Sequence, residues 1–500
     1  MAVTRTSRVM AVLAATVITV VSAAGQVVAQ PETSEQPPSS ESQSQEPSSP
    51  DAPAPGEGNG FATPPPEADN HPLPEDAGGP DLDYKQQKEC VKSQNQTVTL
   101  ESKPWGQDVL RFNELDRFAT GAGQKVAVID TGVFRHNFLN GRLEIGPDYV
   151  DGLPDGSFND CDGHGTEVAG IIAANPGTDD IGFRGIAPNA TILSIRQSSG
   201  LYEFKDEADN TKPPVSAGNL RTLAMSIIRA ASMGATVINM SVDSCRPVSS
   251  GPINQGELDV YAAAKWAVEE MNVVLVASAG NLGEGTCGKQ NSPDPKNPTL
   301  VVTPPWFSEY VISVAAMDKD GGVADFSIQG PWVSVAAPGT EIISLDPANA
   351  TSLANQTVDQ DGKASLIQGT SFAAPYVAGL AALVREKFPE LSARQVMHRI
   401  ISTASHPAAN GGRDNLVGYG MINPVAALTQ RIPAEHGEAP DQAIDTPFEM
   451  PPPYERNWAP MQVAMIGAGG GVGLLLLTLF VIHTVRRNRR EPEGPPKHRV

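Results

Sequence analysis

The chain has 500 residues and a formal net charge of −21 at pH 7. This length allows about three domains at roughly 150 residues each, but the composition is uneven along the chain. Residues 31–80 contain 13 prolines and ten carboxylates, with no Lys or Arg. Because such a stretch can bury little apolar surface, we expect residues 30–85 to form a disordered leader. The negative charge also argues against a nucleic-acid partner, which requires basic patches.

The N-terminus has the pattern of a secretory signal peptide, in which basic residues precede a short apolar run. Arg5 and Arg8 come before an apolar run that starts at Val9, and small residues continue to Ala29. We therefore predict a signal peptide over residues 1–29 and export of the part that follows. The alternative for this run is a first transmembrane anchor.

A second apolar run, from Val463 to Ile482, contains twenty residues without a charge. At about 1.5 Å per residue a helix of this length spans a hydrocarbon core of about 30 Å, so we predict a transmembrane helix over 462–483. Four arginines follow the run, which predicts a cytoplasmic tail over 484–500 by the positive-inside rule. The expected location is the cell membrane, with a single pass and an extracytoplasmic body. The seven prolines and six carboxylates before the run predict an extended linker over 431–461.

The body, residues 86–430, is long enough for one large domain or two. Apolar runs of strand length recur in it, at 125–130, 191–196, 236–241, 273–278, 310–316 and 333–337. Continuous apolarity favours strands that are covered on both faces, as in a parallel sheet. Helical patterns lie between the runs, at 219–233, at 257–271 and after a capping box of Ser392 and Gln395. The alternation predicts an α/β fold with functional residues at the carboxyl ends of the strands.

Four of the segments contain residues that nucleophilic catalysis by serine would use. Such catalysis needs a nucleophile, a base, a carboxylate that orients the base, and donors for the oxyanion. Asp130 ends an apolar run, where a carboxylate can point into a crevice, although Asp before Gly is also common in turns. His164 lies between Gly163 and Gly165, a setting that is unusual for a core residue.

The other two candidates supply a nucleophile and a second donor. Ser371 starts an apolar helix, where unpaired backbone N–H groups favour a developing negative charge. Its alternative is a plain helix N-cap. Asn281 follows the run at 273–278, and its side-chain amide can donate to the same oxyanion.

These segments resemble the motifs of the subtilisin family of serine peptidases. AVIDTGV, DGHGTEVAG, ASAGN and GTSFAAP are similar to its aspartate, histidine, oxyanion-asparagine and serine motifs, and they occur in the subtilisin order. VINMS and VGYGMINPVAAL extend the likeness to residues 105–430. The resemblance implies a subtilisin-like α/β fold, with a mainly parallel central sheet and helices on both faces. It implies that Asp130 orients His164, that His164 is the base for Ser371, and that Asn281 holds the oxyanion.

The order of leader, body, linker, transmembrane helix and basic tail further resembles the mycosins, membrane-anchored proteases of actinobacterial type VII secretion systems. This resemblance implies protein substrates and membrane components of such a system as partners.

The chain departs from ordinary secreted relatives in three ways. Its leader lacks the apolar content of a folded inhibitory pro-domain. Val242 to Cys245 replace a Leu-Gly-Gly stretch of the specificity pocket, and insertions are expected near 197–218 and 282–308.

Four cysteines in an exported body are compatible with two disulfides in three connectivities, the alternative being four free thiols. If the subtilisin-like topology holds, Cys245 and Cys287 both follow strands at the active-site edge, so we expect them to pair. That leaves Cys90 with Cys161. The spacing of Cys and His does not resemble a zinc site, and we expect neither a metal nor a cofactor.

The main expectation is therefore an extracytoplasmic serine endopeptidase, and three alternatives remain. The domain can serve as a scaffold of a secretion complex, with proteolysis secondary, and this role is compatible with activity. It can be a catalytically silent binding domain, although every catalytic position has its expected residue. A carboxyl-type serine peptidase would have Glu in place of His164 and Asp in place of Asn281.

Overall fold

The computed structural model describes residues 60–76, 78–94, 99–178, 180–209, 211–358, 362–437 and 458–488. The predicted signal peptide, the leader before residue 60, most of the linker and the last residues of the tail lie outside this part of the chain. All described residues belong to one unit of the chain, Gly58–Val500.

The centre of the body is a sheet of seven strands in the order β13-β12-β10-β8-β3-β5-β4, with every neighbouring pair parallel. The strands are β3 (Lys125–Asp130), β4 (Leu143–Asp148), β5 (Thr191–Arg196), β8 (Val237–Met240), β10 (Val274–Ser278), β12 (Val311–Met317) and β13 (Val333–Pro338). Six of them coincide with the continuous apolar runs. The edge strand β4 was not predicted, because its sequence LEIGPD is half exposed and has no such run.

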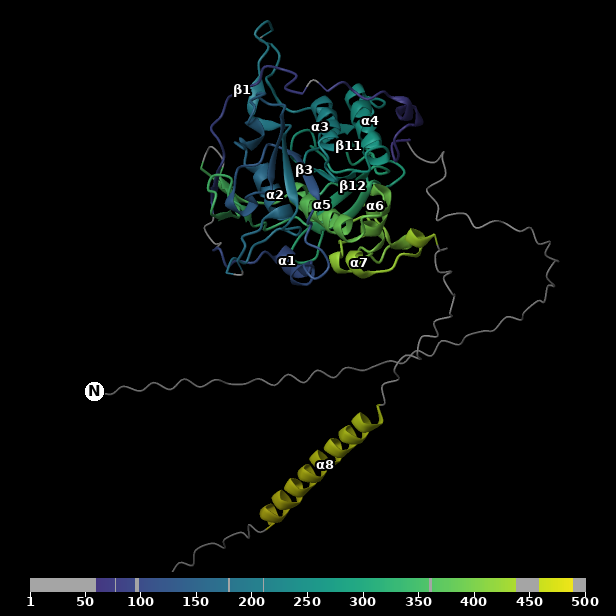
Figure 1. The fold of residues 1–500 in the computed structure, drawn as a ribbon. Coiled ribbons are helices and arrows are strands. Elements are labelled where there is room, and N and C mark those ends of the chain that lie inside the picture. The colour runs from purple at the N-terminus through teal and green to yellow at the C-terminus, as the bar shows by residue number, and fades with distance from the viewer. Residues whose placement is uncertain are drawn as a thin grey trace, which may run out of the picture. The chain divides into compact units, whose positions relative to one another are not determined.

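Helices cover both faces of this sheet (Figure 1). They pair as α2 (His164–Ala173) with α5 (Thr370–Lys387) on one face, and α3 (Leu220–Ser232) with α4 (Gln255–Glu269) on the other. Capping boxes at Asn219 and Asn254 begin α3 and α4, and the predicted box of Ser392 and Gln395 begins α6 (Ala393–Ser402). The predicted α/β fold with a parallel sheet and helices on both faces is confirmed.

The strand order places a crevice at the end of β3. After β3 the chain adds β4 and β5 on one side, and it then crosses to β8, β10, β12 and β13 on the other side. In open parallel sheets ligands bind at such a reversal of strand order, beyond the carboxyl ends of the strands. Asp130 is the last residue of β3 and lies at this point.

Smaller elements surround the central layers. The short helices are α1 (Trp105–Val109) and α7 (Pro424–Thr429). The expected insertion at 197–218 forms β6 (Ser199–Phe204) and β7 (Val215–Ala217), which join β1 (Lys85–Gln86) in a small sheet. The other small sheets join β9 (Ser244–Pro247) to β11 (Leu300–Thr303), β14 (Ser344–Leu345) to β15 (Leu353–Ala354), and β16 (Gln356–Val358) to both β17 (Ala364–Leu366) and β2 (Lys92–Gln94).

The described part of the leader packs on the body, so the prediction of disorder was wrong for residues 60–76 and 78–85. The backbone carbonyl of Phe61 accepts a hydrogen bond from Trp306 at 3.0 Å, and the two rings stack at 6.1 Å. The carboxylate of Asp69 accepts a hydrogen bond from the Tyr261 hydroxyl at 2.5 Å, and Tyr84 is buried. A few aromatic side chains and paired carboxylates are therefore enough to attach a stretch whose average composition is that of a disordered chain.

The structure contains the Cys90–Cys161 and Cys245–Cys287 disulfides, the pairing expected from the family resemblance. Cys161 lies three residues before His164. The first disulfide therefore attaches the N-terminal extension beside the start of α2.

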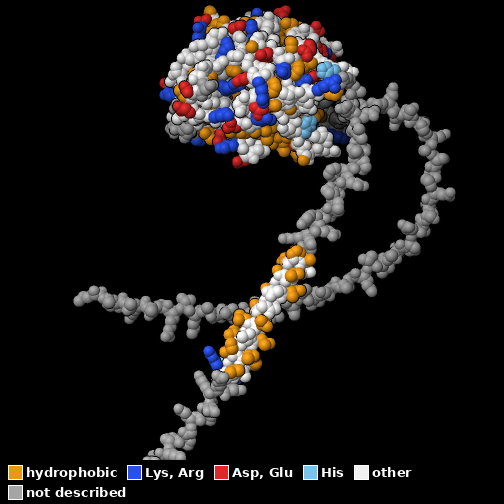
Figure 2. All heavy atoms as spheres, turned by 60° about the horizontal axis from the view of Figure 1, so that its bottom comes forward, with side chains coloured by type: hydrophobic (Ala, Val, Ile, Leu, Met, Phe, Trp, Pro, Cys, Tyr) orange, Lys and Arg blue, Asp and Glu red, His pale blue; other side chains and the backbone are white. Residues whose placement is uncertain are grey.

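The helix α8 (Ala459–Asn488) is long and apolar enough to cross a membrane. Figure 2 shows hydrophobic side chains along its length, and Arg486 and Arg487 lie in its last turn. The twenty residues from Val463 to Ile482 contain no charge, which agrees with the predicted single membrane span.

Candidate active site

Asp130 and His164 form a hydrogen-bonded pair in the crevice. The Asp130 carboxylate is fully buried, and its Oδ1 lies 2.7 Å from Nδ1 of His164 and 2.8 Å from the backbone N–H of Thr131. His164 begins α2 directly after Gly163, which has a left-handed φ of 83°. Because Nδ1 is engaged by Asp130, Nε2 is the ring nitrogen left to exchange a proton.

A buried network holds the two segments together. The Asp160 carboxylate accepts hydrogen bonds from the Thr131 hydroxyl at 2.7 Å and from the Gly163 backbone N–H at 2.8 Å. Gly165 makes the close approach possible, since a Cβ there would lie 2.0 Å from the carbonyl oxygen of Gly132. The glycine after the histidine therefore lets α2 start directly against the turn that follows Asp130.

The surroundings of His164 favour its charged form. Burial by itself lowers the pKa of the imidazole, but the charge of Asp130 and the hydrogen bond to it outweigh burial and raise the pKa to about 9. The buried carboxyl groups of Glu167 and Asp160 act in the same direction. This environment stabilises the imidazolium that forms when the ring accepts a proton.

Ser371 is the second residue of α5 and is almost completely buried. Its carbonyl oxygen accepts a hydrogen bond from the Ser241 hydroxyl at 2.7 Å, and the ring of Phe372 lies 5.0 Å from the ring of His164. Ser371 and His164 line the same groove. At the start of α5 the backbone N–H of Thr370 donates to Asn281 and that of Phe372 donates to the Gly369 carbonyl oxygen, so the backbone N–H of Ser371 is placed to donate to an anion at this position.

Asn281 is oriented by the residue before Ser371. Its Oδ1 accepts hydrogen bonds from the backbone N–H of Thr370 at 2.8 Å and from the Thr370 hydroxyl at 3.0 Å. Its Nδ2 is therefore turned away from Thr370 and donates to the Glu284 carboxylate at 2.9 Å. The amide of Asn281 thus presents a fixed donor next to the start of α5.

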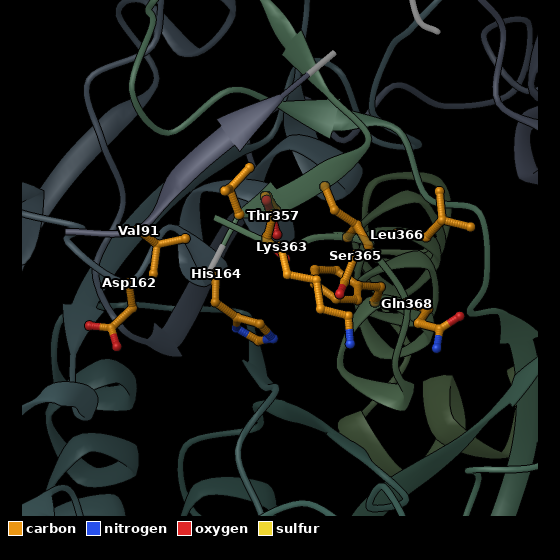
Figure 3. A pocket seen from close by; sticks show the side chains of 12 residues that line it. Val91, Asp162, His164, Thr357, Lys363, Ser365, Leu366 and Gln368 are labelled. Atoms are coloured by element: carbon orange, nitrogen blue, oxygen red, sulfur yellow. The ribbon is translucent and has the colours of Figure 1, made fainter. Parts of the chain in front are cut away.

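Cavities lie on two sides of the imidazole. The groove with Ser371 has a volume of about 680 Å³ and is lined by segments after β8, in β7 and after Asn281. A second cavity of about 300 Å³ also contacts His164 and lies against Val91, Leu366 and Phe372. Figure 3 shows His164 and Lys363 extending into this second cavity. Both cavities thus open beside His164, and one of them also contacts Ser371.

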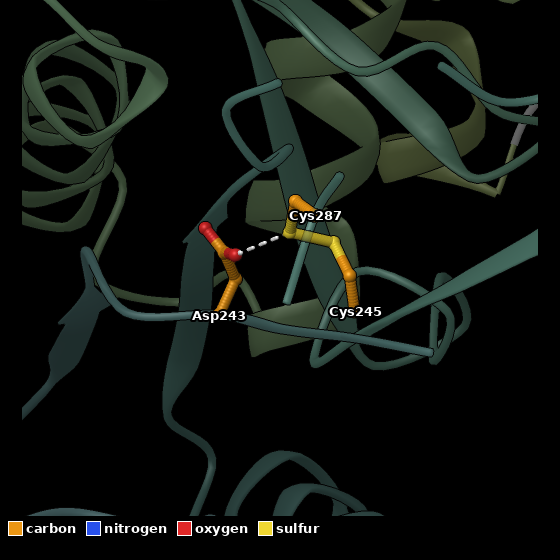
Figure 4. Close-up of side chains that lie close together, drawn as sticks. All are labelled: Asp243, Cys245 and Cys287. Atoms are coloured by element: carbon orange, nitrogen blue, oxygen red, sulfur yellow. Dashed lines mark hydrogen bonds between the residues drawn. A yellow bond between two sulfur atoms is a disulfide. The ribbon is translucent and has the colours of Figure 1, made fainter. Parts of the chain in front are cut away.

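Asp243 lies close to the second disulfide, as Figure 4 shows. The Asp243 carboxylate and the sulfurs of Cys245 and Cys287 fall within 4.8 Å of one another, a spacing that would suit a metal ion. Metal binding by cysteine requires a thiolate, however, and both sulfurs are joined in a disulfide. The group in this cluster that can bind a cation is therefore the Asp243 carboxylate.

Comparison with known proteins agrees with this geometry. The family model "Subtilase family" matches residues 121–420, which is more than half of the chain. The chain belongs to the subtilase family. As a member of this family it is a subtilisin-like serine endopeptidase.

The most similar relatives of this subtilase include mycosins. Mycosin-1 of Mycolicibacterium smegmatis is 40% identical over 417 residues, which cover 79% of this chain and 87% of the relative. Mycosin-1 of Mycobacterium tuberculosis is 40% identical over 431 residues, which cover 82% of this chain and 93% of the relative. The crystal structure of MycP1 from Mycobacterium smegmatis matches with a TM-score of 0.66 and 38% identity, over 75% of this chain and 97% of that chain. A chain from the structure of an intact ESX-5 inner membrane complex matches with a TM-score of 0.68 and 40% identity, over 85% of this chain and 99% of that chain.

The structure brings Asp130, His164, Ser371 and Asn281 together in this subtilase. The residues that position these four were not predicted from the sequence. Thr370 and Phe372 lie within the recognised motif GTSFAAP, so the motif itself was a signal for both. Glu284 gave no signal, because its contact with Asn281 depends on how a loop folds back.

Proposed function

We propose that Asp130, His164 and Ser371 are the catalytic triad of a membrane-anchored endopeptidase. The observation that carries this proposal is the 2.7 Å contact between Asp130 and His164 in a groove that Ser371 also lines. The geometry matches the requirement of a base oriented by a buried carboxylate. The two cavities around His164 support cleavage within a chain instead of at its end.

In the reaction, the Ser371 hydroxyl attacks the scissile carbonyl carbon and His164 Nε2 takes the hydroxyl proton. The carbonyl oxygen, on which negative charge develops, accepts hydrogen bonds from Asn281 Nδ2 and from the backbone N–H of Ser371. His164 then gives its proton to the leaving amine, and an acyl group remains on Ser371. Water releases this acyl group by the same steps, with His164 again as the base.

The body lies outside the cytoplasm in this proposal. Two arginines close α8, and further basic residues follow it in the sequence, which favours a cytoplasmic C-terminus by the positive-inside rule. The two disulfides support the same orientation, because such bonds persist in oxidising compartments.

We further propose that the enzyme works in a type VII secretion system and processes exported proteins. The high coverage of a chain from an ESX-5 inner membrane complex supports this assignment. The same match favours a second role, in which the domain is a structural component of the membrane complex and proteolysis is secondary. One chain can fulfil both roles.

A comparison of three strains separates the two roles. The strains contain the wild type, Ser371→Ala, or no copy of the protein, and both secretion and cleavage of exported proteins are followed. For an enzyme with an additional scaffold role we expect Ser371→Ala to abolish cleavage and to keep secretion, while absence of the protein abolishes both. Unchanged cleavage in the Ser371→Ala strain would refute the proposed triad.

A further inference from the structure

Two carboxylates besides Asp130 line the groove beside Ser371. Asp243 follows β8 by three residues, and Glu284 follows Asn281 by three residues. Among the described residues, those that line this groove include both carboxylates and no Lys or Arg. Across the described part of the chain, neither carboxylate forms an ion pair. Among the described residues of the groove, the charge that offsets these two carboxylates is that of His164, which is already paired with Asp130.

Asp243 is half-buried and poorly satisfied. Its Oδ2 accepts one hydrogen bond, from the Ser278 hydroxyl at 3.2 Å. Its Oδ1 lies 3.4 Å from Sγ of Cys287, which is a disulfide sulfur and has no proton to donate (Figure 4). Burial raises the pKa of Asp243 to about 6, and the charge of Glu284 acts in the same direction. A carboxylate in this state gains more from a cation than one that is fully hydrated.

The position of these groups identifies which substrate residue they meet. The Ser241 hydroxyl bonds to the carbonyl oxygen of Ser371, so the segment that leads to Asp243 starts beside the nucleophile. The opposite wall contains Glu284, Gly285 and Thr286, and it begins next to Asn281. Ser371 and Asn281 fix the attacked carbonyl group, so the side chain on its acyl side lies between these two walls.

The two walls are fixed relative to each other. The Cys245–Cys287 disulfide joins them, and the Thr286 hydroxyl accepts a hydrogen bond from the backbone N–H of Cys245 at 3.0 Å. A bound side chain therefore lies between two segments that are already joined to each other.

We propose that this pocket selects a Lys or Arg side chain in the residue whose carbonyl group is attacked, with Asp243 and Glu284 as its counter-ions. The inference rests on the proposed function, because it assumes that Ser371 is the nucleophile. Asp243 acts from the floor of the pocket, and exposed Glu284 acts from its rim.

The proposal is tested with the full-length protein in detergent and with peptides that differ only in this one residue. The residue is Arg, Lys, citrulline or norleucine, of which citrulline has nearly the shape of Arg without its charge. Binding is measured by fluorescence anisotropy on the Ser371→Ala variant, so that the measurement does not depend on turnover. Cleavage of the same peptides is measured on the enzyme that retains Ser371.

We expect the Arg peptide to bind at least tenfold more tightly than the citrulline peptide. Adding Asp243→Asn reduces this ratio to near one, and Glu284→Gln reduces it in part. Asp320→Asn, a change of an exposed carboxylate outside the groove, keeps the ratio and serves as the matched control. Asp243→Glu keeps the charge and retains a preference for Arg, which separates a loss of charge from a folding defect.

Equal binding of the Arg and citrulline peptides would overturn the proposal, and so would an unchanged ratio in Asp243→Asn. Failure to bind any of the four peptides would count against it as well. Selective binding of the Arg peptide without cleavage by the enzyme that retains Ser371 would refute the proposed catalytic function and leave the pocket inference standing. Cleavage of all four peptides at one rate would overturn the pocket inference and leave the proposed catalytic function standing.

Discussion

The disulfide between Cys90 and Cys161 should stabilise the body without taking part in catalysis. It joins residues 71 positions apart. On the chain-entropy model, replacing both cysteines by Ala raises the entropy of the unfolded chain by about 15 cal/mol/K. This lowers the free energy of unfolding by about 4 kcal/mol at 25 °C. A body of about 350 residues gains about 0.7 kcal/mol/K of entropy on unfolding, so the melting temperature should fall by about 6 °C.

The pair Cys245–Cys287 provides a matched comparison, because it spans 42 positions and differs in chain entropy by only about 0.5 kcal/mol. Melting of both double Ala variants is measured by calorimetry in detergent, together with hydrolysis of one peptide. We expect similar decreases in melting temperature. Hydrolysis should decrease only in the second variant, in which the walls of the groove are no longer joined.

The extension should stay attached when Cys90 is removed, because other contacts hold it. The Asp76 carboxylate pairs with Arg229 at 2.5 Å, and Tyr84 is buried against Val150 and Leu201. A truncation that starts near Glu101 removes these contacts as well and should destabilise the body further than loss of the disulfide alone. A large gain in peptide hydrolysis on truncation would refute this reasoning, because it would identify the extension as an inhibitory propeptide.

Four further predictions concern the chemistry and the topology. Asn281→Ala should lower turnover by about 10²–10³-fold, as expected for one oxyanion donor. In a peptide assay the Ser371→Ala/His164→Ala double change should lower activity little more than either single change. Strictly additive losses of activity would contradict a triad. Because His164 must be neutral to accept a proton and its pKa is raised from 6.5 to about 9, kcat/KM should rise with pH up to about 9. The stability that this shift contributes is complete below pH 6.5 and is lost as the pH rises through about 9. Asp130→Asn should lower the pH at which kcat/KM is half of its maximum. If this pH stays unchanged, a group other than His164 controls the pH dependence. A protease added outside intact cells should release the body by cutting between Arg431 and Pro460 and leave the C-terminal tail protected, and digestion of the tail would reverse the proposed orientation.

The parts of the molecule that are determined by local sequence could be predicted. Continuous apolar runs identified six strands of the central sheet, and the position of Asp130 at the end of one run placed it in the crevice. The helix boundaries at Asn219 and Ser392 followed from local capping, which depends on neighbouring residues alone.

The features that were missed depend on contacts between distant segments. The composition of the leader predicted disorder, because an average over fifty residues does not show that Phe61 and Tyr84 meet aromatic and apolar partners far along the chain. The contact of Glu284 with Asn281 and the setting of Asp243 beside a disulfide follow from the tertiary fold. Such contacts leave no periodicity or spacing in the sequence.

The disulfide connectivity has a consequence for how the body acquires its fold. The first cysteine pairs with the second, and the third pairs with the fourth. In a chain that is exported from its N-terminus, Cys90 and Cys161 emerge before either later cysteine, so each thiol first meets its native partner. Oxidation can therefore keep pace with export, and the native bonds require no reshuffling by an isomerase. A chain with interleaved pairs would instead expose its first thiol to a wrong partner during export.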